Sequence, residues 1–119
     1  MVLYPATYIN GGFTMCGIVG YTGTKEASTV LIDGLKKLEY RGYDSAGIAL
    51  QQGDQLVISK AAGSVAELET VVGDRYRDLK VGIGHTRWAT HGRPTNENAH
   101  PHSSCCEEIA IVHNGIIEN

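Results

Sequence analysis

The chain has 119 residues, a formal net charge of −3 at pH 7 and 42% hydrophobic residues. This length allows one compact domain with a modest core. The mild acidity gives no indication of nucleic-acid binding, and no apolar run approaches the roughly 20 residues of a membrane-spanning helix. The three cysteines include the adjacent pair Cys105 and Cys106. Such a set makes a poor disulfide framework and indicates the reducing cytoplasm.

The residues before Met15 show neither an alternating nor a helical pattern. Gly11 and Gly12 lie shortly upstream of Met15, where a bacterial ribosome-binding sequence of the GGAGG type, read in frame, would encode two glycines. We therefore expect residues 1–15 to be a leader or a mis-called start, and residues 16–119 to form the domain. The alternative is a genuine disordered extension. The nucleotide sequence upstream of Met15 distinguishes the two.

The first half of the domain predicts a strand followed by a helix. Residues 17–22 form an apolar run typical of a buried strand. Residues 25–40 predict a helix, because apolar residues recur there at steps of three and four and make one apolar stripe. Residues 41–47 break this pattern and predict a structured loop.

A hairpin and a short helix are expected next. Residues 46–52 and 55–61 predict two strands, joined by the two-residue turn signal Gly53-Asp54. Ser64 is a suitable N-cap for a helix over residues 65–72, with a glutamate at the capping-box position.

The second half predicts fewer regular elements. Residues 81–84 predict a short strand that leads into a polar segment at 85–92. Residues 93–107 predict a polar loop, and residues 109–113 predict an apolar, buried strand.

Cys16 directly follows Met15 and precedes an apolar, glycine-flanked run. If Met15 is removed, Cys16 carries a thiol nucleophile and a free α-amine that can act as its base. The amine cannot act in this way while Met15 acylates it. The alternative is a small buried thiol at the start of a core strand, which this stretch alone favours.

Arg87 follows a predicted strand and lies close to glycines. Its guanidinium could bind a carboxylate through two parallel hydrogen bonds, with Thr90 and His91 as further donors. The alternative is a solvated arginine. Trp88, the one tryptophan, could be a core residue or the wall of a pocket.

Asn114 and Gly115 follow the last predicted strand. A side-chain amide beside a backbone N–H with little steric cover is the donor pair that an oxyanion hole needs. The alternative is a hairpin turn, for which Asn-Gly is a strong signal. Residues 116–119 do not alternate as a returning strand would.

Histidines and paired cysteines raise the possibility of a metal site, which we reject. Zinc ligands follow spacings such as C-x₂-C, whereas Cys105 and Cys106 are adjacent. His100 and His102 are expected to point to opposite sides of an extended segment that Pro101 stiffens.

Together these motifs resemble the glutaminase domain of glutamine–fructose-6-phosphate aminotransferase. The matching blocks occur in the family's order and spacing and are residues 16–20, 38–47, 84–92, 98–102 and 112–119. The related glutaminases of amidophosphoribosyltransferase and asparagine synthetase share the leading cysteine and an Arg-Gly pair, differ after that pair, and lack the block at 86–92.

The resemblance implies an α+β fold, the αββα sandwich of N-terminal nucleophile hydrolases, here incomplete. Residues 16–119 would be part of a class II glutamine amidotransferase domain. Cys16 would attack the side-chain amide of glutamine and form a thioester that water hydrolyses. The ammonia would convert fructose 6-phosphate to glucosamine 6-phosphate in a separate sugar-phosphate isomerase domain of a homodimeric full-length protein. No metal or organic cofactor is implied.

The resemblance also implies roles for the remaining site residues. Arg87, Thr90 and His91 match positions that hold the substrate carboxylate, Asn114 and Gly115 match the oxyanion hole, and Trp88 matches the mouth of the ammonia passage.

Two departures from the family add alternatives. Residues precede Met15, and the family's glutaminase domain is about twice as long. We therefore expect residues 1–119 by themselves to be inactive and poorly folded, as a truncated fragment of that enzyme. A third possibility is another N-terminal cysteine amide hydrolase, such as one acting on bile salts or penicillins.

Overall fold

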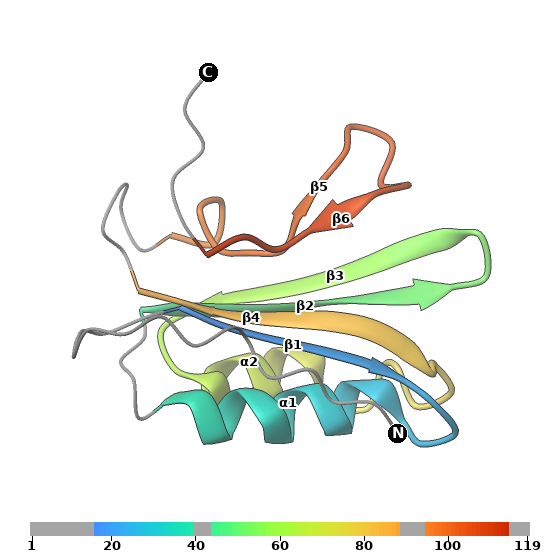
Figure 1. Ribbon diagram of the computed structural model, residues 1–119, viewed down its shortest axis with the longest axis horizontal. Helices are drawn as coiled ribbons and strands as arrows, with labels where there is room; N and C mark the ends of the chain where they lie inside the picture. Colours follow the sequence, from blue (N-terminus) through green and yellow to red (C-terminus); the bar gives the residue numbers. More distant parts are fainter. Residues whose placement is uncertain (1–15, 40–43, 89–94, 115–119) are drawn as a thin grey trace.

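The computed structural model describes residues 16–39, 44–88 and 95–114 (Figure 1). Its elements, in chain order, are β1 (Gly17–Thr22), α1 (Ala27–Leu38), β2 (Ser45–Gln52), β3 (Gln55–Ala62), α2 (Val65–Val72), β4 (Val81–Arg87), β5 (His102–Ser103) and β6 (Ala110–Ile111). No helix in these described ranges has both the length and the apolar composition needed to cross a membrane.

Strands β1 to β4 form one antiparallel sheet in the order β1-β4-β2-β3. β4 lies between β1 and β2, so both of its edges are hydrogen-bonded. Thr86 lies opposite Gly17 on β1 and opposite Ala46 on β2. The sheet therefore brings together the first strand and the strand that ends at Arg87, although they are far apart in sequence.

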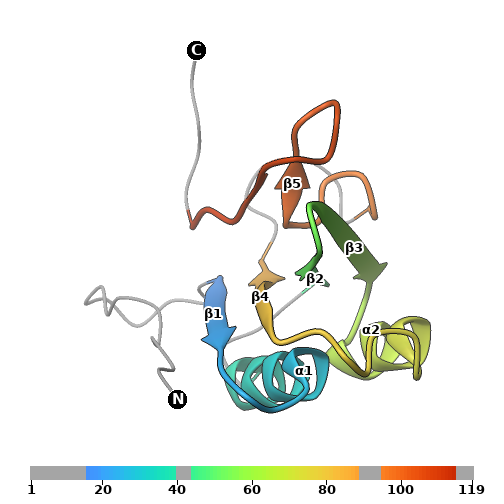
Figure 2. The same ribbon diagram turned by 90° about the vertical axis from the view of Figure 1, so that its right-hand side faces the viewer.

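The described elements make three layers. Helices α1 and α2 cover one face of the sheet, and the β5–β6 hairpin lies over the other face (Figures 1 and 2). The core lies between the helices and the sheet. Its largest fully buried apolar side chains are Leu31, Leu35, Ile48, Leu50, Leu68, Val65 and Val72. A sheet with helices on one face and a second sheet on the other agrees with the expected α+β class.

Helix α1 is shorter than expected, running from Ala27 to Leu38 instead of over residues 25–40. Backbone N–H groups at its start bond to partners outside the helix. The N–H of Lys25 donates to Oη of Tyr21 at 2.8 Å, and the N–H of Ala27 donates to the carbonyl of Leu79 at 2.9 Å. Tyr40 lies outside the described residues. The predicted apolar stripe faces the sheet.

Helix α2 confirms the expected bounds of residues 65–72 and the expected N-cap. The hydroxyl oxygen of Ser64 accepts from the N–H of Glu67 at 3.3 Å. The β2–β3 hairpin is also confirmed, one residue longer at each outer end than predicted. Its turn contains Gly53 at φ +61°, a conformation that glycine adopts without steric cost.

Strand β4 was predicted to end at residue 84 but continues to Arg87. The prediction failed because it followed hydrophobicity along the chain, whereas pairing on both edges extends the strand through polar residues. His85 lies opposite Ile18 on β1 and Gly47 on β2, and Arg87 lies opposite Ser45. Arg87, one of the candidate site residues, is therefore held on a strand.

The predicted strand over residues 109–113 is wrong in length and in burial. β6 contains only Ala110 and Ile111, paired with β5 inside the expected polar loop. Ile109 is 63% exposed and Ile111 is 48% exposed. The turn between β5 and β6 is closed instead by polar bonds, because Oγ of Ser104 accepts from two backbone N–H groups, each at 3.2 Å.

Residues 95–101 pass over the open face of β2 and β3. The N–H of Ala62 donates to Oδ1 of Asn96 at 2.7 Å, and Ala99 is fully buried. Gly47 on β2 makes this approach possible, because a Cβ there would collide with the carbonyl group of His100. The missing side chain therefore sets how closely this segment packs on the sheet.

Gly47→Ala should destabilise the fold, because the atom in its way is backbone and cannot rotate aside. We expect a loss of about 1–3 kcal/mol, the usual cost of overpacking. Gly20→Ala is the matched control, since a Cβ at Gly20 meets nothing within 4 Å. The measurement is urea unfolding of the full-length protein that contains these residues. Equal midpoints for the two variants would contradict the packing argument.

Candidate active site

Cys16 lies immediately before β1, and its side chain meets the backbone that follows β4. The N–H of Trp88 donates to Sγ of Cys16 at 3.3 Å, and the carbonyl of Trp88 lies 3.8 Å from the same sulfur. Cys16 is half-buried. A backbone N–H directed at the sulfur favours negative charge there, which a thiol nucleophile needs.

Two contacts at Gly17 fix the position of Cys16. The N–H of Gly17 donates to Oγ1 of Thr86 at 3.2 Å in a buried environment. A Cβ on Gly17 would lie 2.6 Å from Cδ1 of Leu38, so the end of α1 packs directly against this glycine. The nucleophile candidate is therefore attached to the sheet on one side and supported by a helix on the other.

The side-chain amide of Asn114 joins Cys16 to His85. Nδ2 of Asn114 donates to the carbonyl of Cys16 at 2.9 Å. Oδ1 lies 2.9 Å from Nε2 of His85. A carbonyl oxygen only accepts, so the first bond fixes which end of the amide faces Cys16. Because Oδ1 also only accepts, Nε2 of His85 carries the proton.

Three histidines form a stack on this face of the sheet. The ring centroids of His85 and His100 lie 4.3 Å apart at an interplanar angle of 27°, and those of His100 and His102 lie 4.3 Å apart at 55°. The peptide bond between His100 and Pro101 is cis. The expectation that His100 and His102 point to opposite sides of the chain is therefore wrong, because their rings meet over the sheet.

Burial keeps these imidazoles uncharged. It lowers the pKa of His85 to about 4, although the hydrogen bond that His85 donates to Asn114 opposes the shift. Burial, together with His85 and His102 nearby, lowers the pKa of His100 to about 3. The pKa of His102 is lowered by burial and by the positive charges of Lys60 and Arg87. The stack is thus neutral at pH 7, beside two cationic side chains.

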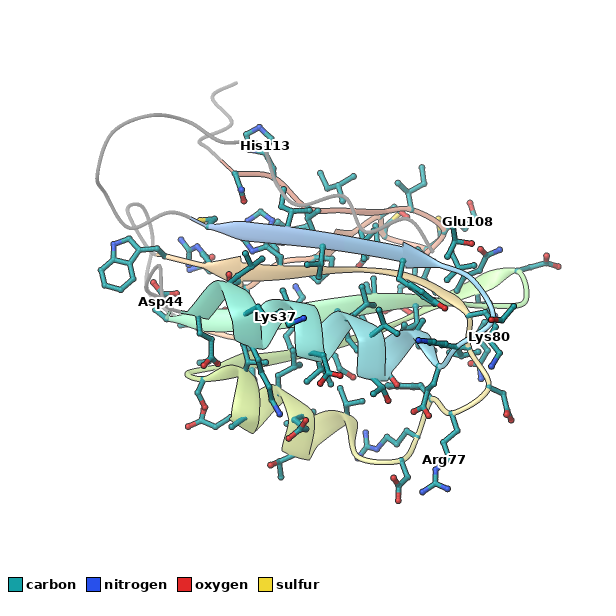
Figure 3. All side chains as sticks on the ribbon, turned by 60° about the horizontal axis from the view of Figure 1, so that its bottom comes forward. Lys37, Asp44, Arg77, Lys80, Glu108 and His113 are labelled. Carbon is teal, nitrogen blue, oxygen red and sulfur yellow. The ribbon has the colours of Figure 1, made fainter. Side chains whose placement is uncertain are left out.

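Arg87 ends β4 on the same face as His85, because alternate residues of a strand share a face. The carbonyl of Arg87 accepts from the N–H of Asp44 at 2.7 Å. Figure 3 shows Asp44 at one end of the sheet and Lys80 and Arg77 at the other. The side chain of Trp88 is 38% exposed, and its backbone N–H lies next to Sγ of Cys16.

The predicted site residues are therefore partly assembled. Cys16 and Asn114 are in contact, and Arg87 and Trp88 belong to the end of β4 beside them. Thr90, His91 and Gly115 lie outside the described residues.

The cysteine pair lies apart from this group. Cys105 and Cys106 are exposed in the turn between β5 and β6, next to Glu108, which Figure 3 places toward the far end of the sheet. Over the ranges that the structure describes, no three His, Cys, Asp or Glu side chains are arranged to hold a metal ion.

Sequence reasoning missed His85, Thr86 and His100. If the predicted strand had been extended beyond residue 84, its alternation would have placed Gly82, Gly84 and Thr86 on one face and His85 on the other, open face. No local signal connects His85 with His100 or with Asn114, because these contacts depend on how the second layer sits on the sheet.

The folded state should lose stability as pH falls below about 6.5. An unfolded histidine takes up a proton near pH 6.5, whereas folded His85 stays neutral down to about pH 4. The contribution of His85 is therefore fully present above pH 6.5 and is lost at up to about 1.4 kcal/mol per pH unit toward pH 4. Urea midpoints at pH 7.5, 6.0 and 5.0 measure the slope. In His85→Gln the slope should be smaller, and an unchanged slope would contradict the assignment.

Comparison with known proteins finds relatives that all carry the same name. No family model matches the chain. It is 59% identical over 105 residues to glutamine–fructose-6-phosphate aminotransferase [isomerizing] of Symbiobacterium thermophilum, 56% identical over 105 residues to that of Clostridium acetobutylicum, and 55% identical over 105 residues to that of Pyrococcus horikoshii. Each match covers 88% of this chain. The chain spans only 17 to 18% of the length of these curated relatives.

A solved structure is similar as well. Glutamine phosphoribosylpyrophosphate amidotransferase from B. subtilis, complexed with ADP and GMP, superposes with a TM-score of 0.60 at 31% sequence identity. The superposition covers 73% of this chain and 19% of that one.

Proposed function

We propose, on the premise that this chain belongs to the family of glutamine–fructose-6-phosphate aminotransferases, that it carries the nucleophile of a glutamine amide hydrolase. Its fold is part of the N-terminal nucleophile hydrolase fold that it shares with the B. subtilis amidotransferase. The observation that carries the proposal is the hydrogen bond from the Asn114 amide to the backbone carbonyl of Cys16, which holds an amide donor at the residue that carries the thiol, 98 residues away in sequence.

In the proposed reaction, the thiol of Cys16 gives its proton to the α-amine of the same residue, and Sγ attacks the side-chain amide carbon of glutamine. The C–N bond breaks, the nitrogen leaves as ammonia with a proton from the α-amine of Cys16, and a glutamyl thioester remains. Water then adds to the thioester, which releases glutamate and restores the thiol. The amine is a base only when Cys16 is the first residue, so we propose that Met15 and everything before it are absent from the active enzyme.

Asn114 and Gly115 are proposed to donate to the oxyanion that forms on the attacked carbonyl. Asn114 supports this role because its amide is already held at the Cys16 end of the sheet. Arg87, with Thr90 and His91, is proposed to hold the substrate carboxylate. A guanidinium at the end of β4 on the open face supports this role, since it carries two parallel donors for a carboxylate. Trp88 is proposed to line the exit of ammonia.

The later steps belong to the full-length protein. We propose that ammonia passes to a sugar-phosphate isomerase domain, where fructose 6-phosphate becomes glucosamine 6-phosphate in a cytoplasmic homodimer. The printed name of the relatives supports the reaction, and the three free cysteines support the cytoplasmic location. Formation of glucosamine 6-phosphate from glutamine by a species of dimeric mass in gel filtration is the test, and a monomer with full activity would contradict it.

The nucleophile is tested in the full-length enzyme. Cys16→Ala should abolish glutamine hydrolysis while added ammonia is still used, because only the amide-cleaving thiol is lost. Intact mass should place Cys16 first in the active species. Cys105→Ala and Cys106→Ala are the controls and should be close to neutral, since both side chains are exposed. Loss of turnover in either control, or turnover by a chain that retains residues 1–15, would refute the assignment.

Two further substitutions separate binding from chemistry. Arg87→Lys keeps the charge and loses the two-point fork, so KM for glutamine should rise by about 10- to 100-fold, as expected for one charged hydrogen bond. Asn114→Ala removes an oxyanion donor, so kcat should fall by about 10²–10³. Steady-state kinetics of both variants measure this split. The opposite pattern would show that the two roles are wrongly assigned.

A further inference from the structure

We infer that His85 is a positioning residue that sets the orientation of the Asn114 amide at the nucleophile. His85 has no place in the proposed chemistry, yet it is completely buried and lies 2.9 Å from Oδ1 of Asn114. The inference deepens the proposed function and rests on it for its catalytic meaning. Its geometric part, the state of the His85 ring and of the amide, stands independently of any reaction.

The hydrogen-bond pattern admits one arrangement of protons. The carbonyl of Cys16 accepts only, so Nδ2 of Asn114 must face it, and Oδ1 must then face His85. With the proton on Nε2, His85 donates to Oδ1. With the proton on Nδ1, two lone pairs would face each other at 2.9 Å, and the amide would gain by turning over. Turning over would remove the bond to Cys16.

The surroundings of His85 hold its ring in place. On the sheet, His85 lies opposite Gly47, which has no side chain to displace it. The His100 ring stacks on it at 4.3 Å, and the His100 backbone in turn lies against Gly47. Among the described residues the buried Nδ1 atom of His85 has no hydrogen-bond partner, and the ring bonds to the side chain of Asn114 through Nε2. A ring fixed by burial and stacking is a rigid donor.

The consequence concerns the second hydrogen of the Asn114 amide nitrogen. One hydrogen of Nδ2 is used by the carbonyl of Cys16. The other is the donor that the proposed function assigns to the oxyanion. Its direction is set once the amide plane is fixed at both ends, by Cys16 and by His85. His85 thus acts on the reaction only through Asn114, and preorganised donors of this kind lower the barrier to acyl transfer.

The kinetic test compares two substitutions in the full-length enzyme. His85→Leu has similar bulk and no donor. It should lower kcat for glutamine by about 10- to 100-fold, a smaller loss than removal of the oxyanion donor itself causes. KM should change by less than about twofold. His85→Gln can present an N–H to Oδ1 and should recover most of kcat. Alkylation of Cys16 by iodoacetamide needs no oxyanion donor, so its rate should stay within about twofold in both variants.

Three kinetic outcomes would overturn the inference. They are equal kcat losses in the leucine and glutamine variants, a parallel loss of Cys16 alkylation, and a rise in KM with kcat intact. The first would show that the donor is irrelevant, the second that the whole site is disturbed, and the third that His85 serves binding.

A second measurement does not depend on folding of a variant or on turnover. Long-range ¹H–¹⁵N correlation spectra of the histidine-labelled wild-type enzyme at pH 7 should show His85 neutral with its proton on Nε2. A proton on Nδ1 would overturn the inference even if glutamine is hydrolysed. If the Nε2 tautomer is found and glutamine is not hydrolysed, the proposed function fails while the positioning of Asn114 stands.

Discussion

The hydrogen bonding of β4 on both of its edges is the constraint on which the rest of the site depends. β1 and β2 occupy the two sides of β4 in fixed antiparallel register. A shift of one residue along β4 would exchange the faces of Thr86 and His85. Thr86 would then leave the N–H of Gly17, and His85 would turn toward the helices. The register therefore decides both the position of Cys16 and which side chains of β4 face the open side of the sheet.

Glycines on β4 and β2 let the layers on both faces approach the sheet closely. On the helix side, Gly82 and Gly84 of β4 meet Leu31, Leu50 and Leu35 directly, and an added Cβ would crowd them. On the open side, Gly47 admits the backbone of His100. Close packing of both layers has an energetic consequence, because a densely packed interior resists even small changes of volume. The close packing that positions the site residues therefore depends on glycines in the strands.

The electrostatic design of the open face is a neutral stack beside cations. Burial lowers the pKa of His100 and His102, and the positive charges of Arg87 and Lys60 lower it further. A charged imidazole in this place would repel the guanidinium that we propose for the substrate carboxylate. An uncharged one still offers a directed N–H. The Nδ1 atoms of His85 and His100 are buried and have no hydrogen-bond partner in the part of the chain that the structure describes, and an unpaired buried polar atom lowers stability.

The sequence by itself determined the elements whose stability is local, and it supplied candidates for the site. The apolar stripe of α1, the Ser64 cap of α2 and the turn at Gly53 each depend on neighbours within a few residues, so their patterns were sufficient. Cys16 and the pair Asn114-Gly115 became candidates in a different way, because their local patterns left a buried thiol and a turn open, and the order and spacing of all the motifs indicated a site. Tertiary structure alone decided that β4 extends to Arg87, that Ile109 and Ile111 are exposed, and that His85, His100 and Asn114 meet. These features arise from pairing and packing between segments distant in sequence, and chain-local hydrophobicity and propensity contain no information about such contacts.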